Sequence, residues 1–359
     1  MAAEDRTAPE IRATPETVTA EWLTAVLHHA GHDGVVAAFE AIRVGTGQVG
    51  QNVRFALRYA AGSGPASIVG KFASDDPASR QTGIALQNYL KEVRFYETLQ
   101  PTLDIRTPTP LLARIDPQTH DFVIMMEDLA PAEQGDQIRG CGADEAAVAV
   151  VEAARLHGPR WNDPALAEIE WLGSRDPAEG AASVRGLWDA VFEPFLARYA
   201  GRLTEEECAL ARALGARFDA YVAPRPGPRT VTHGDYRLDN MLFGGPAPLT
   251  VVDWQSPGLG NGTADVAYFL GTALEPALRR SIEDALLREY VAVLHGYGID
   301  YDLETCRTDY RRASFAGLVM AVIASMIVGQ TDRGDEMFMT MARRSAAMAQ
   351  ELDALSLLS

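Results

Sequence analysis

The chain has 359 residues, of which 47% are hydrophobic and 23% are charged. This usage is typical of a globular protein, and the length is sufficient for two lobes with separate hydrophobic cores. The 49 acidic residues outnumber the 32 basic ones, which gives a formal net charge of -17. Such a surface repels phosphate backbones and anionic lipids, so the composition disfavours binding to nucleic acids and to membrane surfaces.

The cysteines and the apolar segments bear on the compartment in which the protein is expected. Cys141, Cys208 and Cys306 are widely spaced and odd in number, so they predict neither a disulfide framework nor a metal-ligand cluster. The first 15 residues lack the apolar segment of a signal peptide. The apolar run Phe315–Val328 is shorter than the roughly 20 residues of a membrane-spanning helix. We therefore expect a cytoplasmic protein in which this run forms a buried core helix.

The first third of the chain has mainly strand character. Residues 1–15 are polar and are expected to form a flexible tail, and a short amphipathic helix over 19–29 is predicted to begin at the N-cap Thr19. Period-two alternation and turn signals predict strands over 39–44, 53–59 and 67–72.

A helix is predicted next, because apolar residues recur at helical spacing between 81 and 99. A hairpin is predicted over 111–126. After residue 130 the apolar spacing is helical almost throughout, and it predicts helices over about 143–157, 182–200, 204–222, 276–296, 303–328 and 333–356. The exception is 229–253, which is typical of a strand, a loop and a second strand. The predicted organisation is a tail (1–15), a β-rich N-terminal lobe (16–129) and a helical C-terminal lobe (130–359).

The strongest functional signal reads VTHGDYRLDN at 231–240, followed by LTVVDWQ at 249–255. Phosphoryl transfer needs a carboxylate that orients the attacking hydroxyl and accepts its proton, and oxygen ligands that hold Mg²⁺ against the phosphates. Asp235 and Asn240 are close together on one predicted loop, and Asp253 follows an apolar strand. Any one of them alone would more often be a turn or cap residue, but the whole pattern favours this chemistry.

This pattern resembles the aminoglycoside phosphotransferase and choline kinase superfamily. The match is most specific in HGDYRLDN and VVDWQ, and it extends more weakly from about Gly45 to Leu270. The resemblance implies an α+β, bilobal, protein-kinase-like fold with a small β-rich N-lobe and a larger, mainly helical C-lobe, with ATP bound between the lobes. It also implies that Asp235 is the catalytic base and that Asn240 and Asp253 are ligands of Mg²⁺.

The same resemblance gives roles to residues around the motif. His233 is expected to brace the catalytic loop, and so is Asp265 in the segment ADVA, for which a helix N-cap is the alternative. His157, at a Leu-His helix ending, is expected to be structural. Arg237, a candidate catalytic residue, either neutralises charge on the transferred phosphate or pairs with a nearby carboxylate.

Gly45, Gly47 and Gly50 fit the pattern GxGxxG, which also occurs in dinucleotide-binding folds. Such a fold needs a helix directly after the glycines. Residues 52–59 instead alternate like a strand, so we favour a glycine-rich hairpin that covers the ATP phosphates.

Lys71 lies in an apolar predicted strand, where an unpaired ammonium would be costly. By resemblance it contacts the α- and β-phosphates, and a glutamate of the following helix holds it in place. Both Glu92 and Glu97 lie on that helix, and Glu92 matches the family's Glu-x-x-Phe-Tyr arrangement.

The segment MMEDL at 125–129 resembles the hinge of the family. We expect Met126 to flank the adenine ring, and backbone groups around Glu127 and Leu129 to read its edge.

These features predict an ATP- and magnesium-dependent kinase of a small hydroxylated molecule. The two halves of the motif favour different branches, since DWQ resembles ecdysteroid-kinase-like proteins and HGDYRLDN resembles hydroxyacyl-CoA kinases. A nucleotide-binding pseudokinase is the main alternative, and the joint presence of Lys71, Asp235, Asn240 and Asp253 argues against it. A dinucleotide-dependent oxidoreductase is the second alternative.

Overall fold

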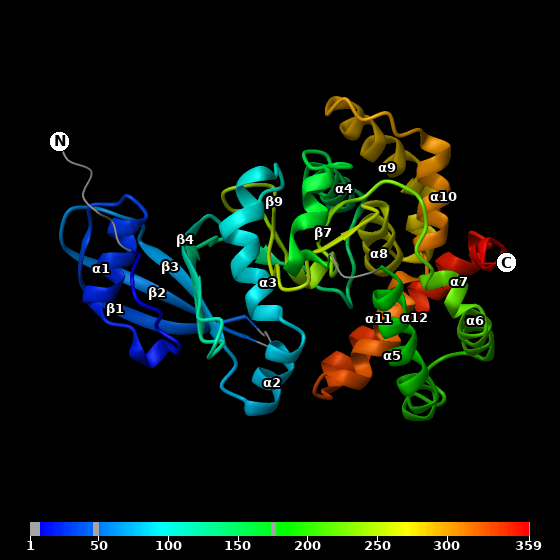
Figure 1. Cartoon of the computed structure of the whole chain (residues 1–359), viewed down its shortest axis with the longest axis horizontal. Coiled ribbons are helices and arrows are strands. Elements are labelled where there is room, and N and C mark those ends of the chain that lie inside the picture. Colours follow the sequence, from blue (N-terminus) through cyan, green and yellow to red (C-terminus); the bar gives the residue numbers. More distant parts are fainter. Residues whose placement is uncertain (1–7, 46–49, 174–176, 359) are drawn as a thin grey trace. The chain divides into compact units, whose positions relative to one another are not determined.

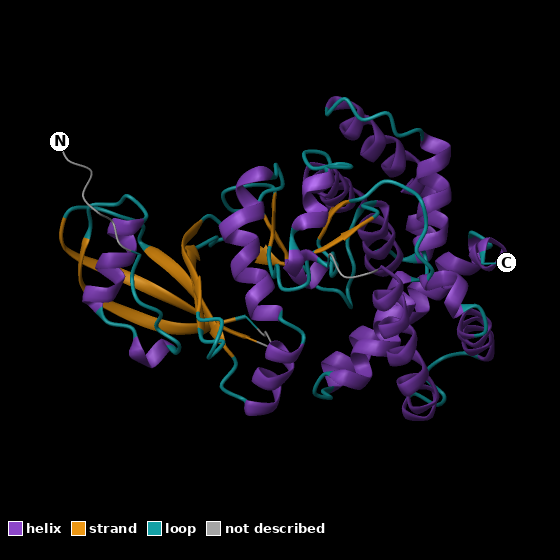
Figure 2. Cartoon of the chain, viewed as in Figure 1, coloured by secondary structure: helices purple, strands orange, loops and turns teal. Residues whose placement is uncertain are grey.

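The computed structural model describes residues 8–45, 50–173 and 177–358. The chain folds into two compact units, and Figure 1 labels most of their helices and strands. Unit 1 comprises Met1–Pro101, Thr107–Pro131 and Val252–Ser256, and unit 2 comprises Thr102–Arg106, Ala132–Val251 and Pro257–Ser359. Unit 1 holds a five-stranded sheet and unit 2 is mostly helical, which confirms the predicted α+β class (Figure 2).

The sheet of unit 1 is antiparallel, with the strand order β1-β2-β3-β5-β4. Its strands are β1 (Val35–Val44), β2 (Gly50–Ala61), β3 (Ser67–Ala73), β4 (Pro110–Ile115) and β5 (Phe122–Glu127). The central strand β3 pairs with β2 on one side and with β5 on the other. Side chains of β3 are therefore flanked on both sides by those of neighbouring strands.

Helix α1 (Ala20–His29) forms a hydrophobic core with the sheet. Thr19 is its N-cap as predicted, because the Thr19 hydroxyl accepts a hydrogen bond from the Trp22 N–H at 3.2 Å. The core contains the alternating residues Val53, Phe55 and Leu57 of β2, which confirms the period-two prediction for that strand. The indole N–H of Trp22 in α1 donates to the carbonyl of Glu10, which lies upstream of the helix, at 2.8 Å.

The predicted single helix over 81–99 is wrong in its continuity. The structure has α2 (Pro77–Ala85), α3 (Asn88–Arg94) and a π-helical turn, Phe95–Leu99. Between the two α-helices, Gln87 adopts a left-handed conformation with φ of 60°, which stops the hydrogen-bond ladder. Leu86 is left half exposed at this break, although the spacing placed it on the apolar face.

The described helices of unit 2 are α4 (Ala143–His157), α5 (Pro177–Arg198), α6 (Glu205–Gly215), α7 (Phe218–Val222), α8 (Thr263–Ala273), α9 (Pro276–Gly296), α10 (Leu303–Ala313), α11 (Ala316–Ile327) and α12 (Asp332–Glu351). Two predicted helices are each divided in the structure: 204–222 into α6 and α7, and 303–328 into α10 and α11. Apolar spacing continues across both breaks because the helices on either side bury apolar residues.

Helix α8 lies at the centre of unit 2. All its residues except Ala264 are buried, and it packs against α4, α9, α10, α11 and α12. A helix that is buried all round is held rigidly by its neighbours.

Short strands frame the polar motif of unit 2. Strand β7 (Thr230–Thr232) pairs with β10 (Gly258–Gly260), and β8 (Met241–Phe243) lies between β6 (Glu133–Gln134) and β9 (Leu249–Val251). The two strands predicted at the ends of 229–253 are present as β7 and β9, but the predicted loop between them also contains a 3-10 turn at Leu238–Asn240 and a third strand, β8.

Among the described residues, one helical stretch, Leu303–Ile327, is long and apolar enough to cross a membrane by length and composition alone. Since 56% of its most apolar window is buried inside the protein, this evidence is weak, and core helices of soluble proteins meet the same criterion.

Candidate active site

Lys71 lies in the middle of β3 and is 8% exposed. Its ammonium has two carboxylate partners within unit 1. Nζ donates to Glu92 Oε1 at 2.8 Å, with Oε2 at 2.7 Å, and it donates to Asp253 Oδ1 at 2.7 Å. Helix α3 supplies Glu92, as the sequence predicted for this pair, whereas Asp253 was not expected to contact Lys71.

The charges of Lys71, Glu92 and Asp253, together with burial, explain the shifted pKa values of Lys71 and Glu92. Burial by itself lowers the pKa of Lys71, but Asp253 and Glu92 outweigh it, so the pKa is raised and the amine stays charged. Burial is also the largest influence on Glu92, whose pKa is raised although Lys71 opposes the change. One ammonium cannot fully compensate two carboxylates, and Glu92, which is 1% exposed, bears the remaining cost.

The backbone at Asp253 is strained, since its φ is 66°, in the region that favours glycine. Neighbouring contacts hold this conformation. Trp254 stacks on Phe95 with 3.9 Å between ring centroids, and the Asn88 amide donates to the Gln255 carbonyl at 2.9 Å. The Gln255 side-chain amide donates to Asp253 Oδ2 at 2.9 Å, so both oxygens of this carboxylate have donors.

The described glycines of the GxGxxG segment have a steric basis. Gly45 has φ of 74°, and a Cβ at Gly50 would lie 3.1 Å from the Phe72 carbonyl and 3.3 Å from Cε of Lys71. Gly50 therefore lets the chain pass close to the lysine. Gly47 lies outside the described residues, so its predicted role stays a prediction.

The predicted hinge residues lie at the end of β5. Met126 and Leu129 are buried, and the Glu127 N–H donates to the Thr109 carbonyl at 3.0 Å. Between them, Asp128 accepts hydrogen bonds from the Arg54 guanidinium at 2.6 and 3.0 Å and from the Ser67 hydroxyl at 2.6 Å.

Unit 2 carries the HGD segment directly after β7. Gly234 has φ of 77°, which turns the chain sharply before Asp235. The turn is held by the buried carboxylate of Asp265, which accepts from the His233 N–H at 2.7 Å and from the Gly234 N–H at 3.1 Å. His157 Nε2 lies 3.3 Å from the same carboxylate. These contacts favour bracing over the helix N-cap as the role of Asp265, because Gly262 occupies the N-cap of α8.

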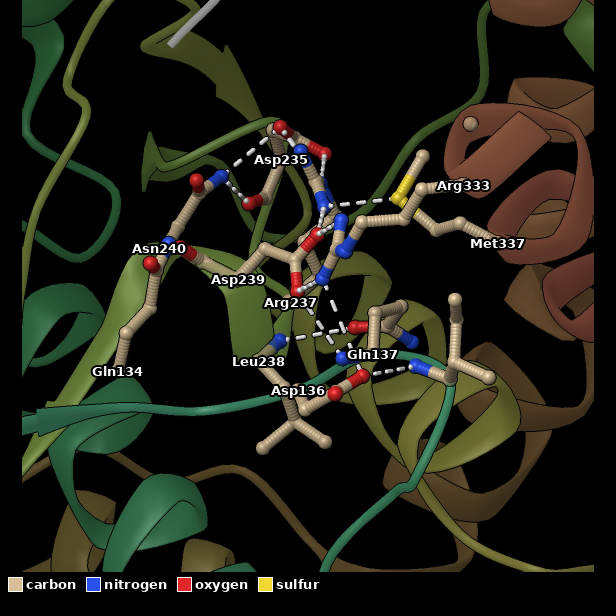
Figure 3. Close-up of polar contacts among 12 residues, drawn as sticks. Gln134, Asp136, Gln137, Asp235, Arg237, Leu238, Asp239, Asn240, Arg333 and Met337 are labelled. Carbon is tan, nitrogen blue, oxygen red and sulfur yellow. Dashed lines mark hydrogen bonds and ion pairs between the residues drawn. The ribbon is translucent and has the colours of Figure 1, made fainter. Parts of the chain in front are cut away.

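The Asp235 carboxylate is held by three donors, of which Figure 3 shows Arg237 and Asn240. Arg237 Nε lies 3.0 Å from each of its oxygens. Oδ2 also accepts from Asn240 Nδ2 at 2.8 Å, and Oδ1 accepts from the Tyr268 hydroxyl at 2.9 Å. A carboxylate that is fixed at both oxygens is pre-oriented for a reaction partner.

Asn240 is oriented so that one of its side-chain atoms suits a cation. Its Nδ2 donates to Asp235 Oδ2 and to the Asp235 carbonyl at 2.9 Å. Both of these atoms are acceptors, so the chemistry of the contacts requires the amide nitrogen on this side. Oδ1 is then the side-chain atom that could bind a metal, and carbonyl oxygens are ligands that Mg²⁺ accepts.

Arg237 pairs with carboxylates, which is one of the two roles predicted for it from the sequence. Besides Asp235, it contacts Asp239 at 2.8 Å and the Met337 sulfur at 3.3 Å (Figure 3). Arg333, in the first turn of α12, donates to both oxygens of Asp239 at 3.1 Å. Burial by itself raises the pKa of Asp239. Arg333 and Arg237 have the opposite effect and outweigh burial, so the pKa of Asp239 is lowered. Burial is the largest single influence and lowers the pKa of Arg237, but Asp235, Tyr268 and Asp239 together raise it by more, so Arg237 stays charged.

The model of the phosphotransferase enzyme family matches residues 39–304, about three quarters of the chain. The chain belongs to the phosphotransferase enzyme family. This membership confirms the resemblance inferred from HGDYRLDN and VVDWQ at the level of the superfamily. The two branches inferred from the motif stay a prediction. None of the curated proteins matches the chain.

Solved structures resemble this phosphotransferase-family chain over most of its length. The GDP complex of aminoglycoside 2'-phosphotransferase-IIIa has a TM-score of 0.54 at 14% identity and covers 92% of this chain and 99% of its own. Choline kinase from Cryptosporidium parvum Iowa II has 0.54 at 9% identity, with 89% and 91% covered. A choline/ethanolamine kinase family protein from Mesorhizobium loti has 0.51 at 16% identity, with 94% and 96% covered. At these identities the likeness concerns the fold, and it confirms the predicted kinase-like class.

The structure thus groups the predicted residues into two sets. Unit 1 brings together Lys71, Glu92 and Asp253, and unit 2 brings together Asp235, Arg237 and Asn240. In the described part of the chain, no group of three or more His, Cys, Asp and Glu side chains is placed to hold a metal ion.

Sequence reasoning missed several residues that contact these sets or adjoin the predicted hinge: Tyr268, Arg333, Gln255 and Asp128. Tyr268 occurs in the apolar segment AYFLGTA and has the sequence signature of a core residue. Arg333 lies 94 positions after its partner Asp239, so no local pattern connects them. Gln255 and Asp128 each adjoin a predicted motif, and their polar side chains next to it are the signal that could have identified them.

Proposed function

We propose that the protein transfers the γ-phosphate of ATP to a hydroxyl group of a small molecule. The observation that carries this proposal is the pre-orientation of Asp235, whose carboxylate is fixed by Tyr268, Arg237 and Asn240 at 2.8 to 3.0 Å. A general base must be held within hydrogen-bonding reach of the proton that it accepts, and a fixed carboxylate on a sharp loop fits that need.

In the proposed reaction, the acceptor hydroxyl donates its proton to Asp235 as its oxygen forms a bond to the γ-phosphorus. The bond between the γ-phosphorus and the bridging oxygen breaks, and ADP is released. Lys71 binds the α- and β-phosphates of the nucleotide, and Glu92 keeps the ammonium in place. Arg237 is held in the structure by Asp235 and Asp239, so we assign it to the orientation of the base.

By the family resemblance, we assign Asn240 and Asp253 as the protein ligands of Mg²⁺. The fit of Asn240 rests on its amide orientation, which directs Nδ2 to Asp235. Asp253 brings a carboxylate, the other ligand type that Mg²⁺ prefers. When bound, the metal supplies positive charge that neutralises the phosphates.

The adenine contacts of Met126, Glu127 and Leu129 belong to the same proposal. The Glu127 N–H is already hydrogen-bonded to Thr109, so a nucleotide edge would use other backbone groups of this segment. One structural relative is a complex with GDP, and another is a complex with GDP and kanamycin. ATP and GTP are therefore both tested as donors, and kanamycin is included among the acceptors.

The test measures release of nucleoside diphosphate with Mg²⁺ and ATP or GTP, across aminoglycosides, choline, sugars, sterols and hydroxyacyl thioesters. We expect Asp235→Asn to lower turnover by about 10²–10⁴-fold with ATP affinity little changed, because the base acts on the acceptor. Asp219→Asn, which neutralises an exposed carboxylate on α7, is the matched control and should behave as the wild type.

Three outcomes would count against the proposal. Asp235→Asn with turnover equal to that of the wild type would exclude Asp235 as the base. ATP binding without transfer to any acceptor, and the same in Asp235→Asn, would favour the pseudokinase. Binding of NAD in place of ATP would favour the oxidoreductase.

A further inference from the structure

Helix α8 contacts three consecutive residues of the catalytic loop through one of its faces. Asp265 and Tyr268 are three positions apart and are therefore neighbours on the helix surface. Asp265 accepts the backbone N–H groups of His233 and Gly234, and Tyr268 donates its hydroxyl to the carboxylate of the next residue, Asp235. The helix thus holds both the backbone that leads to the base and the base itself.

Tyr268 is well suited to hold its partner still. It is 4% exposed and lies on the helix that five other helices of unit 2 enclose. Burial is the main reason why the pKa of Tyr268 is raised well above its usual value, and the charge of Asp235 adds to it. The phenol therefore stays protonated, and it can only act as a donor to the carboxylate.

Arg237, which contacts both oxygens of Asp235, does not by itself fix the plane of the carboxylate. Arg237 Nε is 3.0 Å from both oxygens of Asp235, so it attracts the carboxylate without distinguishing one oxygen from the other. The plane of the carboxylate is set by donors that each bind a single oxygen, which are Tyr268 on Oδ1 and Asn240 on Oδ2. Asn240 belongs to the same loop as Asp235, whereas Tyr268 belongs to a separate, rigid element.

We propose that Tyr268 is a positioning residue of the phosphotransferase reaction, and that its hydroxyl fixes the orientation of the Asp235 carboxylate toward the acceptor. This inference rests on the proposed function, in which Asp235 is the base. It assigns a role to a residue whose sequence context, in an apolar helix, indicated only packing.

The experiment compares Tyr268→Phe with a matched control, Tyr310→Phe. Tyr310 is also buried, and its hydroxyl also donates to a carboxylate, Glu283, at 2.9 Å, but it lies on α10 and contacts no residue of the catalytic loop among the hydrogen bonds of the described chain. Turnover is measured with Mg²⁺–ATP and the best acceptor of the panel, and also with water as the acceptor. Thermal unfolding and ATP binding are measured for both variants.

We expect both variants to lose similar thermal stability, because each loses one buried hydroxyl–carboxylate hydrogen bond. Only Tyr268→Phe should lower kcat, by about 10- to 100-fold, because a small misplacement of a catalytic group has an effect of that size. Its KM and Kd for ATP should stay within about twofold of the wild type. If Tyr268→Phe does not fold, Tyr268→Met, which also lacks the hydroxyl, replaces it in the same comparison.

The outcomes separate this inference from the function on which it rests. A wild-type protein that transfers phosphate to no acceptor, water included, overturns both. An active wild type, with Tyr268→Phe as active as Tyr310→Phe, overturns the role of Tyr268 alone. A loss of kcat that Tyr310→Phe reproduces would show that general destabilisation is the cause, and it would also overturn the inference.

Discussion

Replacing Lys71 by methionine would remove the ammonium that Glu92 and Asp253 share in unit 1. Both carboxylates lie within 2.8 Å of Nζ, so they cannot be more than about 5.5 Å apart. At an effective dielectric constant of about 20, two negative charges at about 5 Å repel by roughly 3 kcal/mol, which is the upper limit because Glu92, whose pKa is already raised to about 7, can take up a proton instead. Removal of one partner from a buried ion pair costs about 3–5 kcal/mol. The two estimates agree in size.

Unit 1 spans about 130 residues. For a unit of that size, 1 kcal/mol corresponds to roughly 3–4 °C in Tm. We therefore expect Lys71→Met to lower the Tm of the nucleotide-free protein by about 10–20 °C at pH 7, as measured by scanning calorimetry. The double variant Lys71→Met/Glu92→Gln should recover most of the loss, because the remaining carboxylate, Asp253, has a side chain that is 27% exposed and can be hydrated.

The matched control is Arg80→Met, which removes one partner of a half-exposed ion pair with Asp121 in the same unit. It should cost at most about 1 kcal/mol, because water screens such pairs. The reasoning is refuted if Lys71→Met melts within 2 °C of the wild type, or if the double variant is no more stable than Lys71→Met.

Two further predictions concern the charged residues around the candidate site. Asp128 has a lowered pKa, because Arg54 and other donors outweigh the effect of burial, which raises it. Asp128→Asn should therefore cost about 1–3 kcal/mol at pH 7. Because the folded-state pKa is lowered, the difference between the two proteins in urea-unfolding experiments should begin to shrink as the pH falls below 3.8 and should vanish below the folded-state pKa. Arg333→Gln removes the guanidinium that holds Asp239, and it should lower kcat about 10-fold with little change in Tm, because Arg333 has a side chain that is 51% exposed. Arg288→Gln, in an exposed ion pair of α9, is its control, and equal kcat values for the two variants would contradict the prediction.

Local patterns predicted the parts of the fold that depend on neighbouring residues. The strand over 53–59 was found because its side chains alternate between core and solvent, and that period follows from strand geometry. The break at Gln87 was missed because no glycine or proline marks it, and a left-handed glutamine leaves no signal in the sequence. The division between α10 and α11 was missed for a similar reason, since no glycine or proline stands between Ala313 and Ala316, where the two helices meet.

The candidate site likewise contains contacts that local sequence patterns predict and contacts that they do not. The pair of Lys71 and Glu92 could be predicted, because a lysine in an apolar strand needs a partner and the next helix offers one. The contact between Lys71 and Asp253 joins residues 182 positions apart, and its existence follows from the tertiary fold alone. Tyr268 is a comparable case, because its apolar context predicts burial but does not identify the partner of its hydroxyl.

The membership of Val252–Ser256 in unit 1 has a consequence for synthesis on the ribosome. The other two segments of that unit end at Pro131, so its last strand is made about 120 residues before this short segment. At ~5–20 residues per second, the delay is roughly 6–25 s. During that time the nascent chain contains Lys71 and Phe95 but neither the carboxylate of Asp253 nor the indole of Trp254. The charged centre of the N-terminal sheet is therefore completed only after residues 252–256 have been synthesised.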